Sequence, residues 1–241
     1  MTHKPAACCI DRRGLLAAGA GSILAAMTAT RVRAEGPAPG DAARSPEHAL
    51  QGLVEGNNRF VTQPEVCELD LAGQRARVAN GQAPWATILS CADSRVPPEM
   101  VFGGRGLGEL FIARNAGNLA DTATVGTLEY GAAVLGSPLI VVLGHSSCGA
   151  VKAACEVVTS NATFPGSIGP MIDPIIPAAL AVRDTAGNFA DNATRESARR
   201  TAARLATSSA TLTGLIQAGK LKILAAIYDL ETGKVEYLSQ T

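Results

Sequence analysis

Five short apolar runs recur along the chain from residue 85 onward, most of them bounded by residues that favour turns. Runs of this length and setting are typical of strands buried in a core. The runs at 85–90 and 139–143 carry no charged side chain, which strengthens that interpretation. The predicted strands are residues 85–90, 109–114, 139–143, 222–228 and 235–238.

The segments around these strands place apolar residues at helical spacing. Ser45 followed by Pro46 is typical of a helix start, with the serine as N-cap and the proline at the first helical position. The predicted helices are residues 45–60, 69–79, 120–135, 147–158 and 190–218, and residues 164–177 are expected to form a Pro- and Gly-rich loop. The alternation predicts an α/β fold, in which helices flank a central, mostly parallel sheet and an N-terminal helical extension precedes it.

The first 34 residues have the pattern of an export signal. The pair Arg12-Arg13 precedes 17 residues without a charge (14–30), and Val32 and Ala34 occupy the small-residue positions before a cleavage site. The paired arginines indicate the twin-arginine type of signal. We therefore expect cleavage after Ala34 and a periplasmic or secreted protein. The alternative is a tail that is not cleaved.

The remainder of the chain is expected to form a single domain over residues 45–241, joined to the signal by a linker at 35–44 that is rich in Gly, Pro and Ala. The apolar part of the signal is too short and too rich in Gly, Ser and Thr for a membrane span, so we expect no stable span after cleavage. Basic and acidic residues number 21 each, without a basic stripe, which argues against nucleic acid as a partner.

Two cysteines and one histidine follow two of the predicted buried strands. Cys91 comes directly after the first strand, and His145 and Cys148 follow the third. Because open α/β sheets keep their sites at the carboxyl ends of the strands, we expect these side chains to converge. Two thiolates and one imidazole suit zinc, and three protein ligands leave a fourth position for water. The pattern therefore predicts a catalytic metal site.

A disulfide is the alternative use of the same cysteines, because exported proteins commonly contain disulfides. The cysteines beyond the predicted signal are Cys67, Cys91, Cys148 and Cys155. Cys155 lies seven residues after Cys148 on one predicted helix, so we expect it to face the core as a small apolar residue. A bond between Cys91 and Cys148 would leave the nearby His145 unexplained.

The stretch Cys-Ala-Asp-Ser-Arg at 91–95, with the later Gly-His-Ser-Ser-Cys-Gly-Ala around His145 and Cys148, resembles the zinc signature of the β-class carbonic anhydrases. The resemblance runs from about Ser45 to Leu238, and its further matches are residues 55–60, 114–118 and 228–234. It implies a carbonate dehydratase that reversibly hydrates carbon dioxide to bicarbonate and a proton by attack of zinc-bound hydroxide. It also implies one Zn2+ per chain and a homodimer or higher homo-oligomer.

The resemblance gives roles to two further residues of the first motif. The aspartate matching Asp93 accepts a hydrogen bond from the hydroxide, and the arginine matching Arg95 clamps that carboxylate and keeps it off the metal. One branch of the family binds bicarbonate at a regulatory site and has Trp three residues before the first zinc cysteine. Ile88 stands there in this chain. We therefore expect the open arrangement, with Asp93 on Arg95 and water on the zinc.

The resemblance also assigns the carbon dioxide pocket to Gln82, Phe111, Ala116 and Tyr130, some of them supplied across a dimer interface. The loop at 102–109 departs from relatives, since it is one residue longer and carries Gly-Gly-Arg ending at Arg105.

Two other functions remain open at this point. Carbonyl sulfide and carbon disulfide hydrolases share this scaffold and would use the same site. A non-catalytic zinc- or bicarbonate-binding protein would keep the metal ligands but is expected to lack the Asp93–Arg95 pair, and both residues are present.

Overall fold

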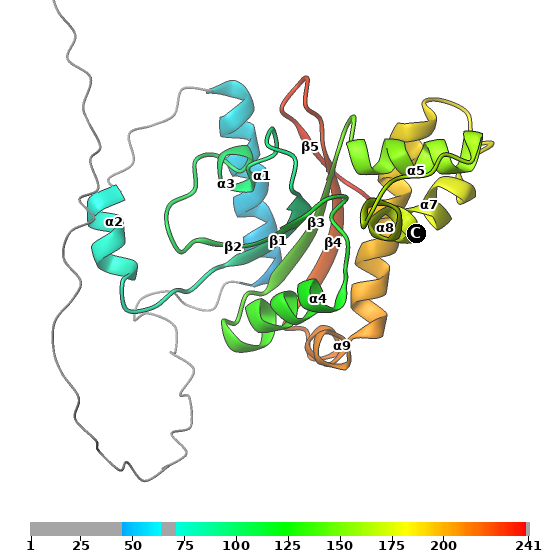
Figure 1. Cartoon of the computed structure of the whole chain (residues 1–241). Helices are drawn as coiled ribbons and strands as arrows, with labels where there is room; N and C mark the ends of the chain where they lie inside the picture. Colours follow the sequence, from blue (N-terminus) through cyan, green and yellow to red (C-terminus); the bar gives the residue numbers. More distant parts are fainter. Residues whose placement is uncertain (1–44, 64–70, 240–241) are drawn as a thin grey trace, which may run out of the picture. The chain divides into compact units, whose positions relative to one another are not determined.

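A single five-stranded sheet lies at the centre of the structure, a computed structural model that describes residues 45–63 and 71–239. The predicted signal and linker (1–44) and Cys67 lie outside the described residues. The sheet has the order β2-β1-β3-β4-β5, where the strands are β1 (Ala86–Cys91), β2 (Leu110–Asn115), β3 (Leu139–His145), β4 (Lys222–Tyr228) and β5 (Val235–Tyr237) (Figure 1). The first four are parallel and β5 is antiparallel to β4, which confirms the predicted mostly parallel sheet.

Helices cover both faces of this sheet, as Figure 1 shows. They are α1 (Pro46–Thr62), α2 (Leu71–Val78), α3 (Pro98–Val101), α4 (Thr122–Glu129), the π-helix η1 (Tyr130–Val134), α5 (Gly149–Ser160), α6 (Ile168–Ile172), the 3-10 helix η2 (Asp173–Ile175), α7 (Ile176–Ala181), α8 (Phe189–Ser208) and α9 (Ala210–Gln217). Among the described residues, no helix is long and apolar enough to cross a membrane.

The core has two main apolar layers because side chains of a strand alternate between the faces of the sheet. Leu89 and Val142 join the layer under α8 and α9, which includes Leu205 and Leu212. The next residues along the strands face the other way, as Ile88 does in the layer under α1 and α3. Every residue of β1 and β3 is buried, so the central strands are covered on both faces.

The N-terminal helix begins where the sequence predicts. The Ser45 side chain accepts a hydrogen bond from the His48 backbone N–H at 3.2 Å, and Pro46 is the first helical residue. Farther along α1, the buried side chain of Asn57 donates hydrogen bonds to the carbonyl oxygens of Val101 and Gly233 at 3.0 and 2.8 Å. This amide ties α1 to the end of α3 and to the turn before β5.

The single long helix predicted over 190–218 is wrong, because the chain breaks at Ser209 into α8 and α9. Ser209 has extended backbone angles (φ −106°, ψ 115°), and its hydroxyl accepts a hydrogen bond from the Leu212 N–H at 3.1 Å. The same hydroxyl donates to Glu129 at 2.6 Å. An N-cap residue has non-helical backbone angles, so α8 ends where Ser209 caps α9.

The loop predicted over 164–177 is also corrected, since it contains α6, η2 and the start of α7. Pro174 and Pro177 lie in the first turn of η2 and α7, where proline does not interrupt a helix. Ile172 and Ile175 are buried, so the segment packs as part of the domain. The helix predicted at 120–135 forms α4 and continues as η1.

Candidate metal centre

The three predicted metal ligands come from two neighbouring strands and the helix that follows one of them. Cys91 is the last residue of β1, and His145 is the last residue of β3. The two strands pair directly, so their carboxyl ends lie at the same edge of the sheet. Ser147 adopts a left-handed backbone conformation (φ 57°), and Cys148 then caps the N-terminus of α5. Both motifs therefore meet at one place.

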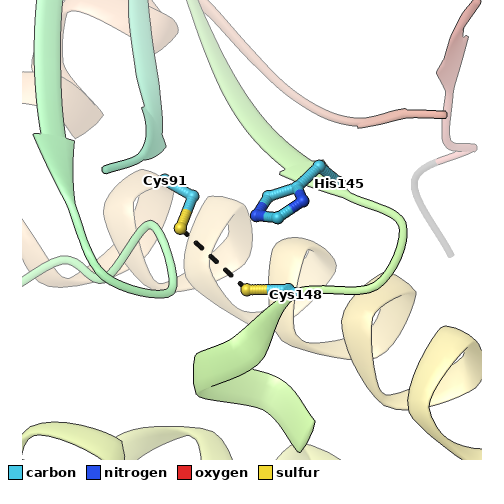
Figure 2. Close-up of side chains that lie close together, drawn as sticks. All are labelled: Cys91, His145 and Cys148. Atoms are coloured by element: carbon cyan, nitrogen blue, oxygen red, sulfur yellow. Dashed lines mark hydrogen bonds between the residues drawn. The ribbon is translucent and has the colours of Figure 1, made fainter. Parts of the chain in front are cut away.

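The side chains of Cys91, His145 and Cys148 point toward one another, as Figure 2 shows. One ligand atom from each lies within 4.8 Å of the others, and all three residues are buried. The sulfur atoms of Cys91 and Cys148 are 4.0 Å apart, and both cysteines are free. The disulfide alternative therefore does not describe this structure. Cys155 is also free and buried, as its predicted core position requires.

The orientation of His145 leaves one ring nitrogen for a metal. Its Nδ1 atom lies 2.9 Å from the Ser146 carbonyl oxygen, which can only accept, so Nδ1 carries the proton. The lone pair is then on Nε2. That atom is buried and has no hydrogen-bond partner among the residues that the structure describes. Metal-binding histidines are commonly held by such a bond through the other nitrogen.

The hydrogen bond between the two thiols shifts their pKa values in opposite directions. The hydrogen bond with Cys148 lowers the pKa of the Cys91 thiol, and that hydrogen bond together with burial raises the pKa of Cys148. The Gly117 N–H also donates to the Cys91 sulfur at 3.4 Å. A divalent cation in place of the shared proton would allow both groups to be thiolates. With the free Nε2 of His145, this donor set fits zinc.

Asp93 and Arg95 form the pair that the sequence predicts. The Arg95 Nε and Nη2 atoms donate to the two carboxylate oxygens of Asp93 at 2.9 and 2.7 Å, and the Arg95 backbone N–H donates at 3.0 Å. These hydrogen bonds hold the pKa of Asp93 well below its usual range. The carboxylate is also near the ligands, since its Oδ2 lies 3.9 Å from Nε2 of His145.

The predicted pocket residues have different settings. Phe111 on β2 and Tyr130 at the start of η1 come together, with ring centroids 6.2 Å apart. Gln82 is exposed in the segment before β1, and Ala116 directly follows β2 and is partly buried. Their role in a pocket stays a prediction. Arg105 lies elsewhere, because it donates hydrogen bonds to the carbonyl oxygens of Phe102 and Gly52 and stacks over Trp85.

One residue beside the site was given no role by the sequence. The side chain of Arg114, from β2, donates hydrogen bonds to the carbonyl oxygens of Cys91 and Asp93. The sequence feature that could have pointed to it is a cation at the end of a predicted strand, within the matched stretch 114–118. The partners could not be read from the sequence because they depend on the pairing of β1 with β2.

The chain is similar in sequence and in fold to known carbonic anhydrases. The family model described as carbonic anhydrase matches residues 86–235. Carbonic anhydrase 2 of Mycobacterium tuberculosis is 37% identical over 190 residues, which cover 79% of this chain and 91% of that protein.

Two solved structures share the fold. The Coccomyxa β-carbonic anhydrase in complex with acetazolamide is 26% identical and covers 78% of this chain and 86% of its own, with a TM-score of 0.62. One of two tetrameric β-carbonic anhydrases from Sordaria macrospora gives a TM-score of 0.61 at 22% identity, over 68% and 85% of the two chains. With the sequence matches, these likenesses show that the chain belongs to the β-class carbonic anhydrase family.

Proposed function

We propose that this chain binds one zinc ion through Cys91, His145 and Cys148 and catalyses the reversible hydration of carbon dioxide to bicarbonate and a proton. The observation that carries this proposal is that two free thiols meet the Nε2 atom of a buried histidine, which has no hydrogen-bond partner in the described part of the chain. Membership of the family supports it. Bound zinc would lower the pKa of water to about 7, which makes hydroxide available near neutral pH.

Asp93 would orient the reacting water. Its carboxylate stays ionised because Arg95 holds its pKa far below neutral, so it can accept a hydrogen bond from the water but cannot donate one. The bidentate contact with Arg95 also fixes the plane of the carboxylate. Arg95 therefore keeps Asp93 as an acceptor at the site and occupies the oxygen atoms that could otherwise approach the metal.

The substrate pocket is proposed to include Gln82, Phe111, Ala116 and Tyr130. Carbon dioxide is small and apolar, so it needs apolar walls, and the adjacent rings of Phe111 and Tyr130 can supply them. Phe111 lies on β2, which is at the edge of the sheet, and Tyr130 is 48% exposed in the single chain. A homodimer or larger homo-oligomer that covers this edge would complete the pocket.

Export is the remaining part of the proposal. Its support is the pattern of residues 1–34, with paired arginines and a cleavage site after Ala34. Expression of the whole chain in a bacterium with an active twin-arginine pathway tests it. We expect a periplasmic protein whose N-terminus is Glu35; a cytoplasmic product that retains Met1 would contradict it.

The enzymatic proposal is tested by stopped-flow hydration of carbon dioxide, with zinc measured on the same sample. We expect one zinc per chain and fast hydration in the wild type. Asp93→Asn keeps the size of the side chain and removes its charge, so it should retain zinc and lose most of the activity. A chain with one zinc and no hydration above the uncatalysed rate would contradict the proposal.

A further inference from the structure

Arg114 contacts the main chain on both sides of Ala92. Its Nε atom donates to the Cys91 carbonyl oxygen at 2.9 Å, and its Nη2 atom donates to the Asp93 carbonyl oxygen at 2.6 Å. The two carbonyls belong to a metal ligand and to the proposed acceptor of the reacting water. A single side chain from the neighbouring strand thus holds both.

These contacts lie at the point where the pairing of β1 with its neighbouring strands ends. The pairing of β1 with β3 ends at Ser90, and its pairing with β2 ends at Cys91. Ala92 adds one further hydrogen bond, from its N–H to the Asn115 carbonyl oxygen at 3.0 Å. At the far end of the turn, Val96 is fully buried. Asp93 therefore lies between two fixed points, the backbone hydrogen bond of Ala92 and the buried side chain of Val96.

Arg95 orients the Asp93 carboxylate but cannot fix the turn. It lies two residues away in the same turn, and its side chain is 57% exposed. The Asp93 carbonyl also accepts the Val96 N–H at 3.0 Å, again within the turn. If the turn moved, Asp93 and Arg95 would move together. Arg114 is the contact that ties Asp93 itself to β2.

We propose that Arg114 is a positioning residue, which fixes the turn at 92–95 so that the Asp93 carboxylate stays at its place beside His145. This inference rests on the proposed function, in which Asp93 acts on the reacting water. The guanidinium suits the task because it is planar and presents two N–H donors along one edge, matched here to two carbonyls two residues apart. An ammonium group offers no such fixed pair.

The first test compares Arg114→Gln with Arg105→Gln. Arg105 makes the same kind of double contact, to the carbonyls of Phe102 and Gly52, so its loss controls for the removal of such a clamp. In Arg114→Gln we expect kcat to fall on the order of tenfold to a hundredfold with KM little changed. Losses of this size are typical when a residue that holds a metal ligand in place, without binding the metal itself, is removed. Zinc content should not change, because Cys91 remains paired in the sheet. Arg105→Gln should keep the wild-type kcat.

Chemical rescue separates positioning from a general effect on folding. Arg114→Ala leaves space beside the two carbonyls, so added methylguanidine should restore part of its kcat, at concentrations that leave the wild type unchanged. Arg114→Lys should recover less than the full activity, since it cannot hold both carbonyls in the same way. No rescue, together with equal losses in the Arg105 control, would overturn the proposal.

Hydrogen exchange provides a readout that does not depend on activity. Mass spectrometry of the zinc-loaded proteins should show faster exchange over residues 92–96 in Arg114→Gln and unchanged exchange there in Arg105→Gln. Unchanged exchange in the Arg114 variant overturns the positioning role, whatever the rates. Faster exchange in a protein whose wild type takes up zinc but does not hydrate carbon dioxide overturns the proposed function and leaves the positioning role standing.

Discussion

The Arg95 guanidinium binds both carboxylate oxygens of Asp93, Nε to Oδ1 at 2.9 Å and Nη2 to Oδ2 at 2.7 Å. Lysine would keep the charge at this position but not the pair of parallel donors. We therefore expect Arg95→Lys to lower kcat/KM for carbon dioxide hydration by about tenfold or more, with zinc retained. Arg200→Lys is the matched control, because Arg200 pairs with Glu196 on the exposed side of α8. Equal activity of the two variants would contradict a role for the bidentate contact.

Removal of the metal should expose two thiols. Cys91 and Cys148 are free and 4.0 Å apart, so a chelator that strips zinc leaves both available to a thiol reagent. The number of reactive thiols in the native protein should rise by two on chelation. Cys155→Ala should leave that difference unchanged, since Cys155 lies outside the ligand set. Cys148→Ser should reduce the difference, and a count that does not change on chelation would contradict the metal assignment.

Gly117 should tolerate no side chain. It has a positive φ of 82°, and an added Cβ would lie 2.8 Å from the Ile175 side chain. Its N–H also donates to the Cys91 sulfur. We expect Gly117→Ala to lower the free energy of unfolding by about 1–3 kcal/mol and to reduce activity as well. Urea denaturation and hydration assays measure the two effects.

Gly136→Ala is the control for backbone strain alone. Gly136 also has a positive φ (73°), but an added Cβ would meet nothing within 4 Å. This variant should lose some stability and keep its activity. If both glycine variants kept full activity, the contact between Gly117 and the metal centre would not contribute to catalysis.

The Arg195–Glu236 pair, which joins α8 to β5, should make stability depend on pH. Arg195 donates to both oxygens of Glu236 and thereby lowers the pKa of that carboxyl. A lowered folded-state pKa stabilises the protein above the unfolded value of about 4.3, and the contribution is lost as the pH falls through the folded-state pKa. Because both side chains are partly exposed, Arg195→Gln should cost less than about 1 kcal/mol at neutral pH.

Urea unfolding of this variant and the wild type should show a difference in stability at neutral pH that shrinks toward zero in acid. Arg59→Gln, on the exposed side of α1, is the control and should show no such pH-dependent difference. A difference for Arg195→Gln that grew on acidification would have the wrong sign for this pair.

The sequence predicted those helices and strands for which the local residue pattern and the packing in the fold favour the same structure. The start of α1 followed from the Ser45 cap, and the buried strands followed from their apolar runs. The break at Ser209 was missed because the helical pattern continues through it, while the cap and the hydrogen bond to Glu129 favour a new helix. Helical structure within 164–177 was missed because proline was interpreted as a loop signal rather than as the first turn of a helix.

Some features of the candidate site could likewise be predicted from the sequence, and others could not. Residue types and spacing were enough to predict the ligands Cys91, His145 and Cys148, because strand ends in a parallel sheet meet at one edge. The contacts of Arg114 depend on how β1 and β2 pair and on how far a long side chain reaches. Those quantities are set by the folded sheet and leave little trace in a single sequence.

The most direct test of the central claim is a zinc titration of the metal-free chain, followed by carbon dioxide hydration at each step. The account predicts that activity rises in proportion to bound zinc and stops rising at one ion per chain. Cys148→Ser, which lacks one ligand, should bind zinc more weakly and show little activity. Full occupancy of the wild type at one zinc per chain without hydration above the uncatalysed rate would contradict the account.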